Sequence, residues 1–408
     1  MAFVESLICR ECSRTYEVAP SYFCEWCFGP LEVLYDYDAI ADTISREKIA
    51  EGPPTLWRYA DLLPVEASAA ADLGAGFTPL VRADRLAEVL GLGELWVKND
   101  TLNPTNSFKD RPVTVAVTKA LEFGIKTVAC ASTGNLANAV AAHAARAGLD
   151  SYVFVPHDIE RSKIVATAAL GTVVAVQGNY DDVNRLCVQL NEEYPWGLVN
   201  INLRPYYAEG SKTLAFETAE QLGWQLPDHV VVPVASGALL TKIARGFDEL
   251  VRVGLVDANE VRISGAQAEG CSPVATAFLE GSDDVRPQKP NTIAKSLAIG
   301  DPADGYYALR EVRRSGGAVA AVTDDEIVEA IHLLARTEGI LTEPAGGVTV
   351  ATLAKLAREG QVTESERVVI YITGHGLKAT EVIAADDPVA IPATIDGFRS
   401  EFEIKEYA

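Results

Sequence analysis

The stretch NDTLNPTNSFKDRP, residues 99–112, places Lys109 directly after a polar loop and at the start of a predicted helix. The β-branched run ELWVK, residues 94–98, precedes it. A lysine there lies near the positive end of the helix dipole, which favours the neutral amine that Schiff-base chemistry needs. Most lysines after a loop are solvated surface charges, so the role of Lys109 depends on the segments around it.

Outward from this stretch, short β-branched runs alternate with amphipathic or Ala-rich segments to about residue 385. This alternation predicts an α/β fold with parallel sheets covered by helices on both faces. Ligands of such sheets bind at the carboxyl ends of the strands. The predicted strands are residues 94–98, 127–132, 151–156, 172–177, 229–234, 262–269 and 367–373, and the predicted helices include 136–147, 180–194, 210–222 and 239–253.

Three more loops at predicted strand ends carry polar groups. In ASTGNLANAV, residues 131–140, Ser132, Thr133, Gly134 and Asn135 precede an Ala-rich helix, where hydroxyls and helix N–H groups suit a carboxylate. An ordinary capped helix would have the same pattern.

The other two loops offer backbone access. In VPVASGALLTK, residues 232–242, the small residues let backbone N–H groups approach a phosphate. In YITGHGLKA, residues 371–379, the Thr373 hydroxyl could donate to a ring nitrogen. Tight packing turns, and a His375 with no chemical part, are the alternative interpretations.

Together and in this order, the four loops resemble those of the fold-type II pyridoxal-phosphate enzymes, specifically the threonine synthase family (tryptophan synthase β-like). Further matching segments include AEGSKTLAFE, AQAEGCSPV, NTIAKSLAIGDPADG and EPAGGVTVATLAKL, so the resemblance covers nearly all of residues 56–380. It implies Lys109 as the Schiff-base lysine, Asn135 as the partner of the cofactor's 3-hydroxyl, and Thr373 facing the pyridine nitrogen. The cofactor phosphate would lie on Ala235, Ser236, Gly237, Ala238 and Leu239.

The resemblance also implies a reaction and a domain organisation. O-Phospho-L-homoserine and water would become L-threonine and phosphate, with Lys109 as the general base. Two α/β/α domains are expected, the larger cofactor-binding one formed by residues 58–95 and 206–385 and the smaller by residues 96–205. A segment resembling a zinc ribbon (1–38), a linker (39–57) and a C-terminal tail (386–408) complete the chain.

The substrate needs groups for its own phosphate and carboxylate. Arginine presents a fork of donors matched to phosphate, although each cation here could equally be a surface charge. The phosphate candidates are Arg161, Ser162, Lys163, Asn200 and Arg204, and the carboxylate candidates are Ser132, Thr133 and the backbone near Gly134.

Some positions depart from the commonest family pattern. Asn106 stands where a glycine is usual, Leu136 replaces a frequent threonine, and the phosphate loop VASGALL is poorer in glycine and asparagine. These differences leave the cofactor assignment intact, but they concern the identity of the substrate and the rate of the reaction. A pyridoxal-phosphate β-eliminase or β-replacase, of the threonine dehydratase, cystathionine β-synthase or cysteate synthase type, is therefore the alternative.

Four cysteines form two Cys-x-x-Cys pairs, Cys9 with Cys12 and Cys24 with Cys27. Paired knuckles of this kind predict a tetrahedral Zn²⁺ site, and so short a segment needs a metal to fold. Reduced cysteines that bind no metal are the alternative. An enzyme core made inactive and used as a metal-dependent binding protein is disfavoured by the intact Lys109.

Composition excludes several other classes. The 408 residues carry a formal charge of -22, which disfavours nucleic acid and anionic membrane surfaces as partners. The N-terminal stretch interrupts any signal core with Glu5 and Arg10, so we expect a cytoplasmic protein. A nicotinamide-dependent dehydrogenase is also disfavoured, because the segment GHGLKA, residues 374–379, lacks the last glycine of the dinucleotide-binding pattern G-x-G-x-x-G. A homodimer is what the family usually shows.

Overall fold

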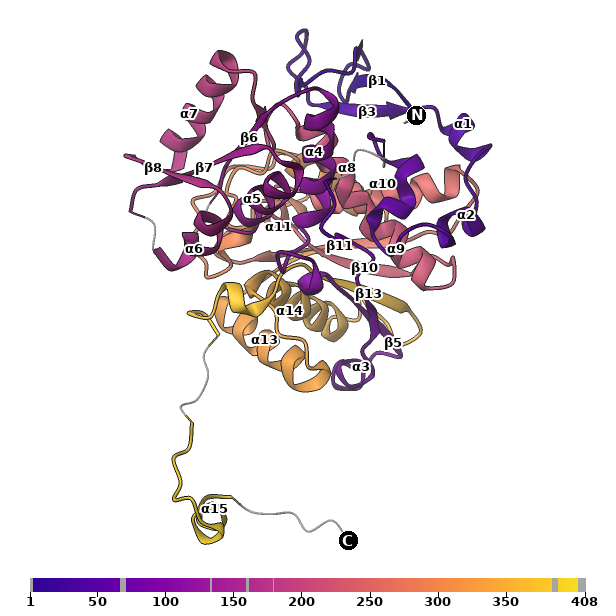
Figure 1. Cartoon of the computed structure of the whole chain (residues 1–408). Helices are drawn as coiled ribbons and strands as arrows, with labels where there is room; N and C mark the ends of the chain where they lie inside the picture. Colours follow the sequence, from indigo (N-terminus) through magenta and orange to yellow (C-terminus); the bar gives the residue numbers. More distant parts are fainter. Residues whose placement is uncertain are drawn as a thin grey trace.

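The computed structural model of the chain describes residues 3–66, 71–132, 134–158, 161–178, 180–383 and 388–402. Three sheets lie in this part of the chain: a three-stranded sheet near the N-terminus, a six-stranded sheet and a four-stranded sheet (Figure 1). The four-stranded and six-stranded sheets follow the predicted α/β pattern.

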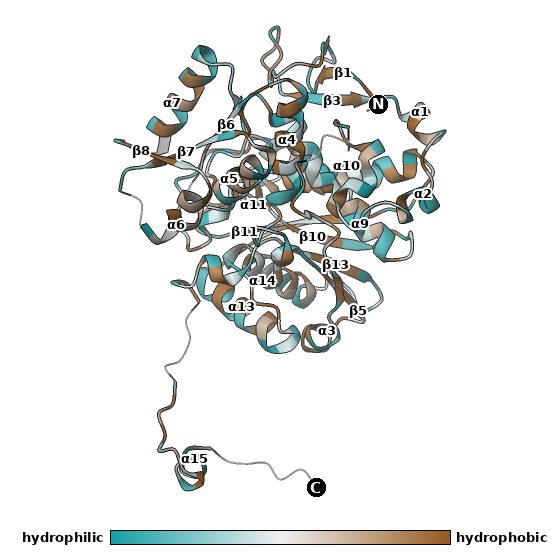
Figure 2. Cartoon of the chain, in the orientation of Figure 1, coloured by the Kyte–Doolittle hydropathy of each residue, from teal (hydrophilic) through white to brown (hydrophobic). Residues whose placement is uncertain are grey.

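The six-stranded sheet is parallel except for its edge strand β4, which pairs antiparallel with β5. Its central strands are runs of Val and Ile because helices cover both faces, and Figure 2 shows the hydrophobic residues gathered along them. In spatial order the strands are β12 (Val319–Val322), β11 (Arg262–Ala268), β10 (His229–Pro233), β13 (Arg367–Ile372), β5 (Glu94–Asn99) and β4 (Leu80–Arg82).

The four-stranded sheet is entirely parallel. Its spatial order is β8 (Thr172–Val176), β7 (Asp150–Pro156), β6 (Thr127–Ala131) and β9 (Gly197–Leu198). The helices that accompany it are α4 (Asp110–Glu122), α5 (Asn135–Ala147), α6 (Arg161–Leu170), α7 (Tyr180–Glu193) and α8 (Arg204–Glu209).

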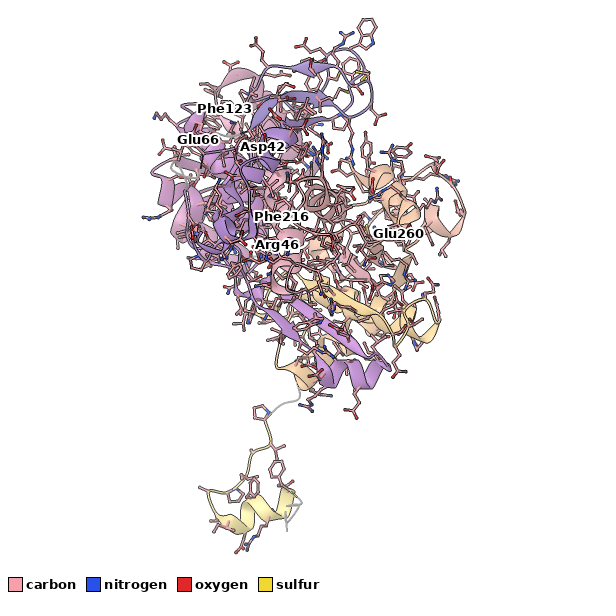
Figure 3. All side chains as sticks on the ribbon, turned by 90° about the vertical axis from the view of Figure 1, so that its right-hand side faces the viewer. Asp42, Arg46, Glu66, Phe123, Phe216 and Glu260 are labelled. Atoms are coloured by element: carbon pink, nitrogen blue, oxygen red, sulfur yellow. The ribbon has the colours of Figure 1, made fainter. Side chains whose placement is uncertain are left out.

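The remaining helices belong mainly to the six-stranded sheet, where α14 packs against β10, β12 and β13. They are α3 (Asp84–Leu90), α9 (Thr213–Gln221), α10 (Ala238–Arg252), α11 (Pro273–Leu279), α12 (Gly305–Arg314), α13 (Asp324–Glu338) and α14 (Pro344–Arg358). Short 3-10 helices are η1 (Leu56–Leu62), η3 (Asp100–Leu102), η4 (Gly210–Lys212), η5 (Lys295–Leu297) and η6 (Gly376–Lys378). Viewed from the side (Figure 3), Phe216 lies inside this packing and is fully buried.

The ends of the chain form two small additions. The N-terminal ribbon, which we define as residues 3–35, contains β1 (Val4–Cys9), β2 (Thr15–Tyr16) and β3 (Leu31–Tyr35), and α1 (Tyr37–Ala41) and α2 (Arg46–Ala50) follow it. Helix α15 (Ile395–Glu401) lies apart from the body in Figure 1. No helix in the described ranges is both long and apolar enough to cross a membrane.

The seven predicted strands are all present, each within a residue or so of its predicted ends. The four helices named from the sequence are present as α5, α7, α9 with η4, and α10. Strand β5 crosses the boundary placed between residues 95 and 96, because all six of its residues pair with β13. The predicted linker 39–57 contains α2 and most of α1. The division into two domains remains a proposal.

A buried cluster of charges joins the start of α4 to the six-stranded sheet. The fully buried Arg111 guanidinium donates to both Asp100 oxygens, at 2.6 and 2.8 Å, and to both Glu217 oxygens. Lys98 on β5 lies 2.6 Å from Glu217. Although burial lowers the pKa of Arg111, these two carboxylates raise it above its ordinary value, and the side chain stays charged.

A second network of charges, largely buried, connects the ribbon to the rest of the protein. Glu32 on β3 lies 3.1 Å from Lys242 Nζ and 2.8 Å from Arg245 on α10. Lys242 also contacts Glu209 at the end of α8, which accepts a hydrogen bond of 2.7 Å from the Tyr35 hydroxyl. The ribbon is therefore held by ion pairs as well as by apolar contacts.

We expect Arg111→Ala to lower the free energy of unfolding by about 3–5 kcal/mol, because it leaves two carboxylates buried without their partner. Urea denaturation measures the effect. Arg286→Ala is the matched control: Arg286 is exposed and 3.3 Å from exposed Glu280, so its loss costs about 1 kcal/mol or less. Equal losses in the two variants would contradict the argument.

Stability should also depend on Glu32 in acid. Burial raises the pKa of Glu32, but the charges of Lys242, Arg245 and Arg10 lower it from 4.5 to about 2. A carboxyl whose pKa is depressed in the folded state stabilises the fold above its unfolded pKa and loses that contribution as the pH falls. We expect the unfolding free energies of wild type and Glu32→Gln to differ most above about pH 4.5 and to converge toward pH 2. A difference in unfolding free energy between the two proteins that grows as the pH falls would contradict this expectation.

Candidate active site

Lys109 lies where the loop after η3 meets the first turn of α4. Its Nζ donates a 3.1 Å hydrogen bond to the Tyr207 hydroxyl and lies 4.5 Å from the centre of the Phe108 ring. The loop is fixed from the other side by Phe108, whose N–H donates to the Thr373 carbonyl at 2.9 Å. Lys109 and Thr373, predicted from separate motifs, are thus brought together.

The two charged residues that follow Lys109 are already engaged by other side chains. Asp110 accepts from the Thr105 N–H at 2.7 Å and lies 3.0 Å from His143 Nε2 on α5. Arg111 is engaged in the buried cluster. Asn106 has a φ of 61°, a left-handed conformation that asparagine tolerates better than most residues, which explains how it can replace the usual glycine.

Asn135 opens α5 and points at a residue that the sequence analysis did not single out. Its Nδ2 donates to Glu343 Oε1 at 2.8 Å, and the Ser296 hydroxyl donates to the same oxygen at 3.4 Å. Burial raises the pKa of the Glu343 carboxyl, while the nearby charges of Lys378 and Lys109 oppose that shift. Glu343 immediately precedes Pro344 at the start of α14, and this helix-start position is the signal that could have identified it.

The backbone also connects Glu343 to Gly374, the residue that follows Thr373. The Glu343 N–H donates to the Gly374 carbonyl at 3.0 Å. A Cβ built on Gly374 would lie 2.4 Å from Glu343 Oε1, so a larger residue here would displace the Glu343 carboxylate. Thr373 itself is nearly buried at the end of β13.

The predicted phosphate loop has the shape that an anion site needs. Gly237, with a φ of 94°, caps α10, whose first N–H groups have no partner within the helix. Ser236 lies beside them, its Oγ 3.5 Å from the Ala238 N–H. A Cβ on Gly237 would lie 2.5 Å from the Asp304 carbonyl oxygen, so the close approach of the two loops depends on glycine.

The predicted substrate residues are placed unevenly. Ser132 Oγ accepts from the Gly134 N–H at 3.4 Å at the start of α5. Asn200 has a buried amide oxygen without a hydrogen-bond partner among the described residues. Arg204 Nη2 donates to Asp304 Oδ2 at 2.5 Å. Arg161 is exposed at the start of α6, Thr133 lies outside the described residues, and the side chains of Ser162 and Lys163 are likewise not described.

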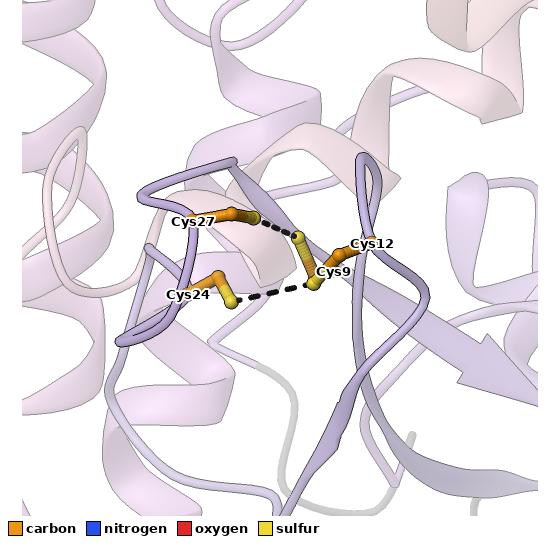
Figure 4. A group of neighbouring side chains, drawn as sticks. All are labelled: Cys9, Cys12, Cys24 and Cys27. Atoms are coloured by element: carbon orange, nitrogen blue, oxygen red, sulfur yellow. Dashed lines mark hydrogen bonds between the residues drawn. The ribbon is translucent and has the colours of Figure 1, made fainter.

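The four ribbon cysteines converge on one point (Figure 4). Their sulfur atoms all lie within 4.8 Å of one another, with Cys9 and Cys27 at 3.4 Å and Cys12 and Cys24 at 3.6 Å. Both knuckles have the same turn: Ser13 N–H donates to the Cys9 carbonyl and Phe28 N–H to the Cys24 carbonyl. Although burial raises the pKa of Cys24, hydrogen bonds from Tyr16 and the backbone lower it to about 6. These thiols could hold a tetrahedral metal ion.

The residues present also fit pyridoxal phosphate. The site offers a lysine amine, an amide at a helix start, a glycine-capped helix N-terminus and a hydroxyl at a strand end. The Ser107 hydroxyl, two residues from Lys109, is buried without a partner in the described part of the chain. Tyr207 was missed by the sequence analysis, because nothing local distinguishes it from Tyr206 on α8.

Gly237→Ala should weaken the affinity for pyridoxal phosphate by about tenfold or more, because the added Cβ displaces Asp304 and the N–H groups that receive the phosphate. Equilibrium titration of apoprotein with the cofactor measures this. Gly254→Ala, at the other end of α10, is the control: its φ is 74° with open space around it, so it shares a strain of about 1–2 kcal/mol but no clash. Equal affinity of both variants and wild type would contradict the assignment.

Comparison with known proteins identifies the family of the chain. Residues 71–374 match the family described as pyridoxal-phosphate dependent enzyme. Among solved structures, the chain resembles threonine deaminase isoform 2 from Solanum lycopersicum (TM-score 0.62, 23% identity, 75% of this chain and 82% of that one). It also resembles diaminopropionate ammonia lyase from Escherichia coli (TM-score 0.64, 20% identity, 77% and 88%). These distant likenesses concern the fold alone.

Closer relatives are threonine synthases. The chain is 43% identical over 390 residues to that of Methanocaldococcus jannaschii, covering 94% of this chain and 96% of the relative. It is 41% identical over 401 residues to that of Methanosarcina acetivorans, covering 96% and 97%. The chain therefore belongs to the pyridoxal-phosphate-dependent enzymes and, within them, to the threonine synthase family.

Proposed function

We propose that the chain converts O-phospho-L-homoserine and water to L-threonine and phosphate, the last step of threonine biosynthesis. The observation that carries this proposal is the position of Lys109, whose Nζ lies between Tyr207 and Phe108 next to the end of β13. Family membership supplies the reaction, and this arrangement supplies the residues for it.

Lys109 would hold pyridoxal phosphate as a Schiff base, with Asn135 at its ring hydroxyl and the loop 235–239 at its phosphate. Bound there, the cofactor supplies an electron sink for negative charge that develops on the substrate carbons. Thr373 would place a hydroxyl, and not an acid, at the ring nitrogen. The nitrogen would then stay unprotonated, and the ring would withdraw less electron density from the substrate. This restraint disfavours transamination and racemisation.

Lys109 would also move the protons of the reaction. Its amine would take the proton from Cα and then one from Cβ, so that a Cβ–Cγ double bond forms as phosphate leaves Cγ. Protons would then be returned to Cγ and Cα, and the oxygen of water would bond to Cβ while the proton that water loses is released with phosphate. The Tyr207 hydroxyl, 3.1 Å from Nζ, orients the amine between these positions. Burial lowers the pKa of Lys378, which lies close to Glu343 and adds positive charge to this region when it is protonated.

Groups for the substrate remain at the ends of β6 and β9. Ser132 and Thr133 at the start of α5 would bind the carboxylate. The Asn200 amide, with an unused buried oxygen, has hydrogen-bonding capacity left for a ligand, and Arg204 lies one turn before Tyr207 on the same side of α8. Arg161, Ser162 and Lys163 are the remaining candidates for the substrate phosphate.

We also propose that Cys9, Cys12, Cys24 and Cys27 bind a structural Zn²⁺. Four thiols that all lie within 4.8 Å of one another are the ligand set that tetrahedral zinc prefers. A homodimer and a cytoplasmic location remain predictions.

An absorbance spectrum of purified protein, followed by phosphate release and threonine formation from O-phospho-L-homoserine, tests the proposal. We expect a visible band of lysine-bound pyridoxal phosphate that Lys109→Ala abolishes together with activity, whereas Lys126→Ala, an exposed lysine before β6, keeps both.

Two outcomes would separate the alternatives. A coloured protein that forms no threonine would contradict the substrate assignment. Activity on serine or threonine that exceeds activity on O-phospho-L-homoserine would favour a β-eliminase or β-replacase.

A further inference from the structure

The first cysteine knuckle touches the catalytic body through the two residues between its thiols. Arg10 and Glu11 lie between Cys9 and Cys12. The Arg10 guanidinium lies 3.6 Å from the centre of the Tyr307 ring, and the Tyr307 hydroxyl donates to Glu11. The residues that a metal ion would hold in place are therefore the ones that contact the first turn of α12.

Arg10 also reaches the residue that caps α12. Its Nη1 lies 3.6 Å from Asp304 Oδ1, and the Asp304 side chain is only 9% exposed. The other carboxylate oxygen of Asp304 accepts from Arg204 Nη2 at 2.5 Å. One buried carboxylate thus sits between a guanidinium of the ribbon and a guanidinium of α8.

The backbone of Asp304 is part of the candidate phosphate loop. Its N–H donates to the Ser236 carbonyl at 2.8 Å, and its carbonyl lies where a Cβ of Gly237 would be. Arg204 is one turn from Tyr207, which holds Lys109. Asp304 therefore contacts the ribbon, the loop 235–239 and the helix that orients the catalytic lysine.

We propose that Asp304 is a positioning residue through which the cysteine knuckle of the ribbon sets the phosphate-binding loop and Arg204. The inference rests on the proposed placement of the cofactor phosphate at residues 235–239. It also rests on the proposed zinc site: cysteines that hold zinc would fix the position of Arg10 between them. Arg10 and Arg204 both contact the Asp304 carboxylate. Without Arg10, Asp304 is paired with Arg204 alone and is drawn toward α8, away from the position that its contacts with the ribbon maintain.

The affinity for the cofactor at residues 235–239 would therefore depend on metal binding at the four cysteines, although the two sites are separate. Couplings of this kind change affinity by about 5- to 150-fold, and we expect the lower end because the Arg10–Asp304 contact is 3.6 Å long. Loss of Arg10, loss of the Asp304 charge and loss of zinc should each weaken cofactor binding by about five- to tenfold.

Equilibrium titration of the apoprotein with pyridoxal phosphate, in full-length protein of measured zinc content, tests the coupling. The variants are Arg10→Ala, Asp304→Asn, Cys9→Ser and the double variant Cys9→Ser with Arg10→Ala. Arg14→Ala is the matched control, since Arg14 is an exposed ribbon arginine that lies 4.8 Å from the Trp26 ring within the ribbon.

We expect weaker cofactor binding in the three single variants, unchanged binding in Arg14→Ala, and a double variant no weaker than Cys9→Ser alone. Cys9→Ser should contain no zinc. Wild-type affinity in Arg10→Ala and Asp304→Asn would overturn the proposal, as would full additivity in the double variant.

Thermal unfolding of every variant distinguishes a lost coupling from a lost fold. Arg10→Ala keeps all four thiols, so it remains interpretable if Cys9→Ser unfolds the ribbon. Wild-type protein that binds no pyridoxal phosphate would refute the proposed function itself. Unchanged affinity for pyridoxal phosphate in Arg10→Ala and Asp304→Asn would refute only this inference.

Discussion

The arrangement of Lys109, the proposed catalytic lysine, depends on the buried guanidinium of Arg111. Its donors are shared between Asp100, next to β5, and Glu217 on α9, so the first turn of α4 has one position relative to the six-stranded sheet. Removing charges from water is costly, and only complete pairing offsets that cost. Lys109 precedes Arg111 by two residues, so the ion pairs of Arg111 fix the backbone that carries Lys109 without using its amine.

The acidic charge of the chain has a structural use in its interior. Glu209 and Glu217 are buried and Glu32 is half-buried. All three pair with lysines and arginines, and these cations lower the pKa of each carboxyl although burial opposes the shift. The resulting ion pairs join the ribbon and α4 to the rest of the enzyme. The proposed phosphate sites are then local: they lie at helix N-termini and at Arg204, whose charge is already shared with Asp304.

Much of the fold and part of the site follow from the sequence. The seven strands were predictable because runs such as HVVVPV, residues 229–234, are buried on both faces and need no distant information. Lys109, Asn135 and the loop at Gly237 could be predicted as site residues because each lies at the junction of a strand or loop with a helix. Tyr207, Glu343 and Asp304 were not identified, since a tyrosine in a helix and carboxylates in loops have no local pattern that marks them as parts of a site.

The sequence by itself determined the order of strands and helices, the four loops that carry chemistry and the two cysteine pairs, because these features depend on periodicity and spacing over a few residues. Only the tertiary structure decided which side chains meet. Asn135 and Glu343 are 208 residues apart and Arg204 and Asp304 are 100 apart, yet both pairs are hydrogen-bonded. A hydrogen bond depends on ångström-scale positions, and those positions are set by how the two large sheets and the ribbon pack together, which no local pattern records.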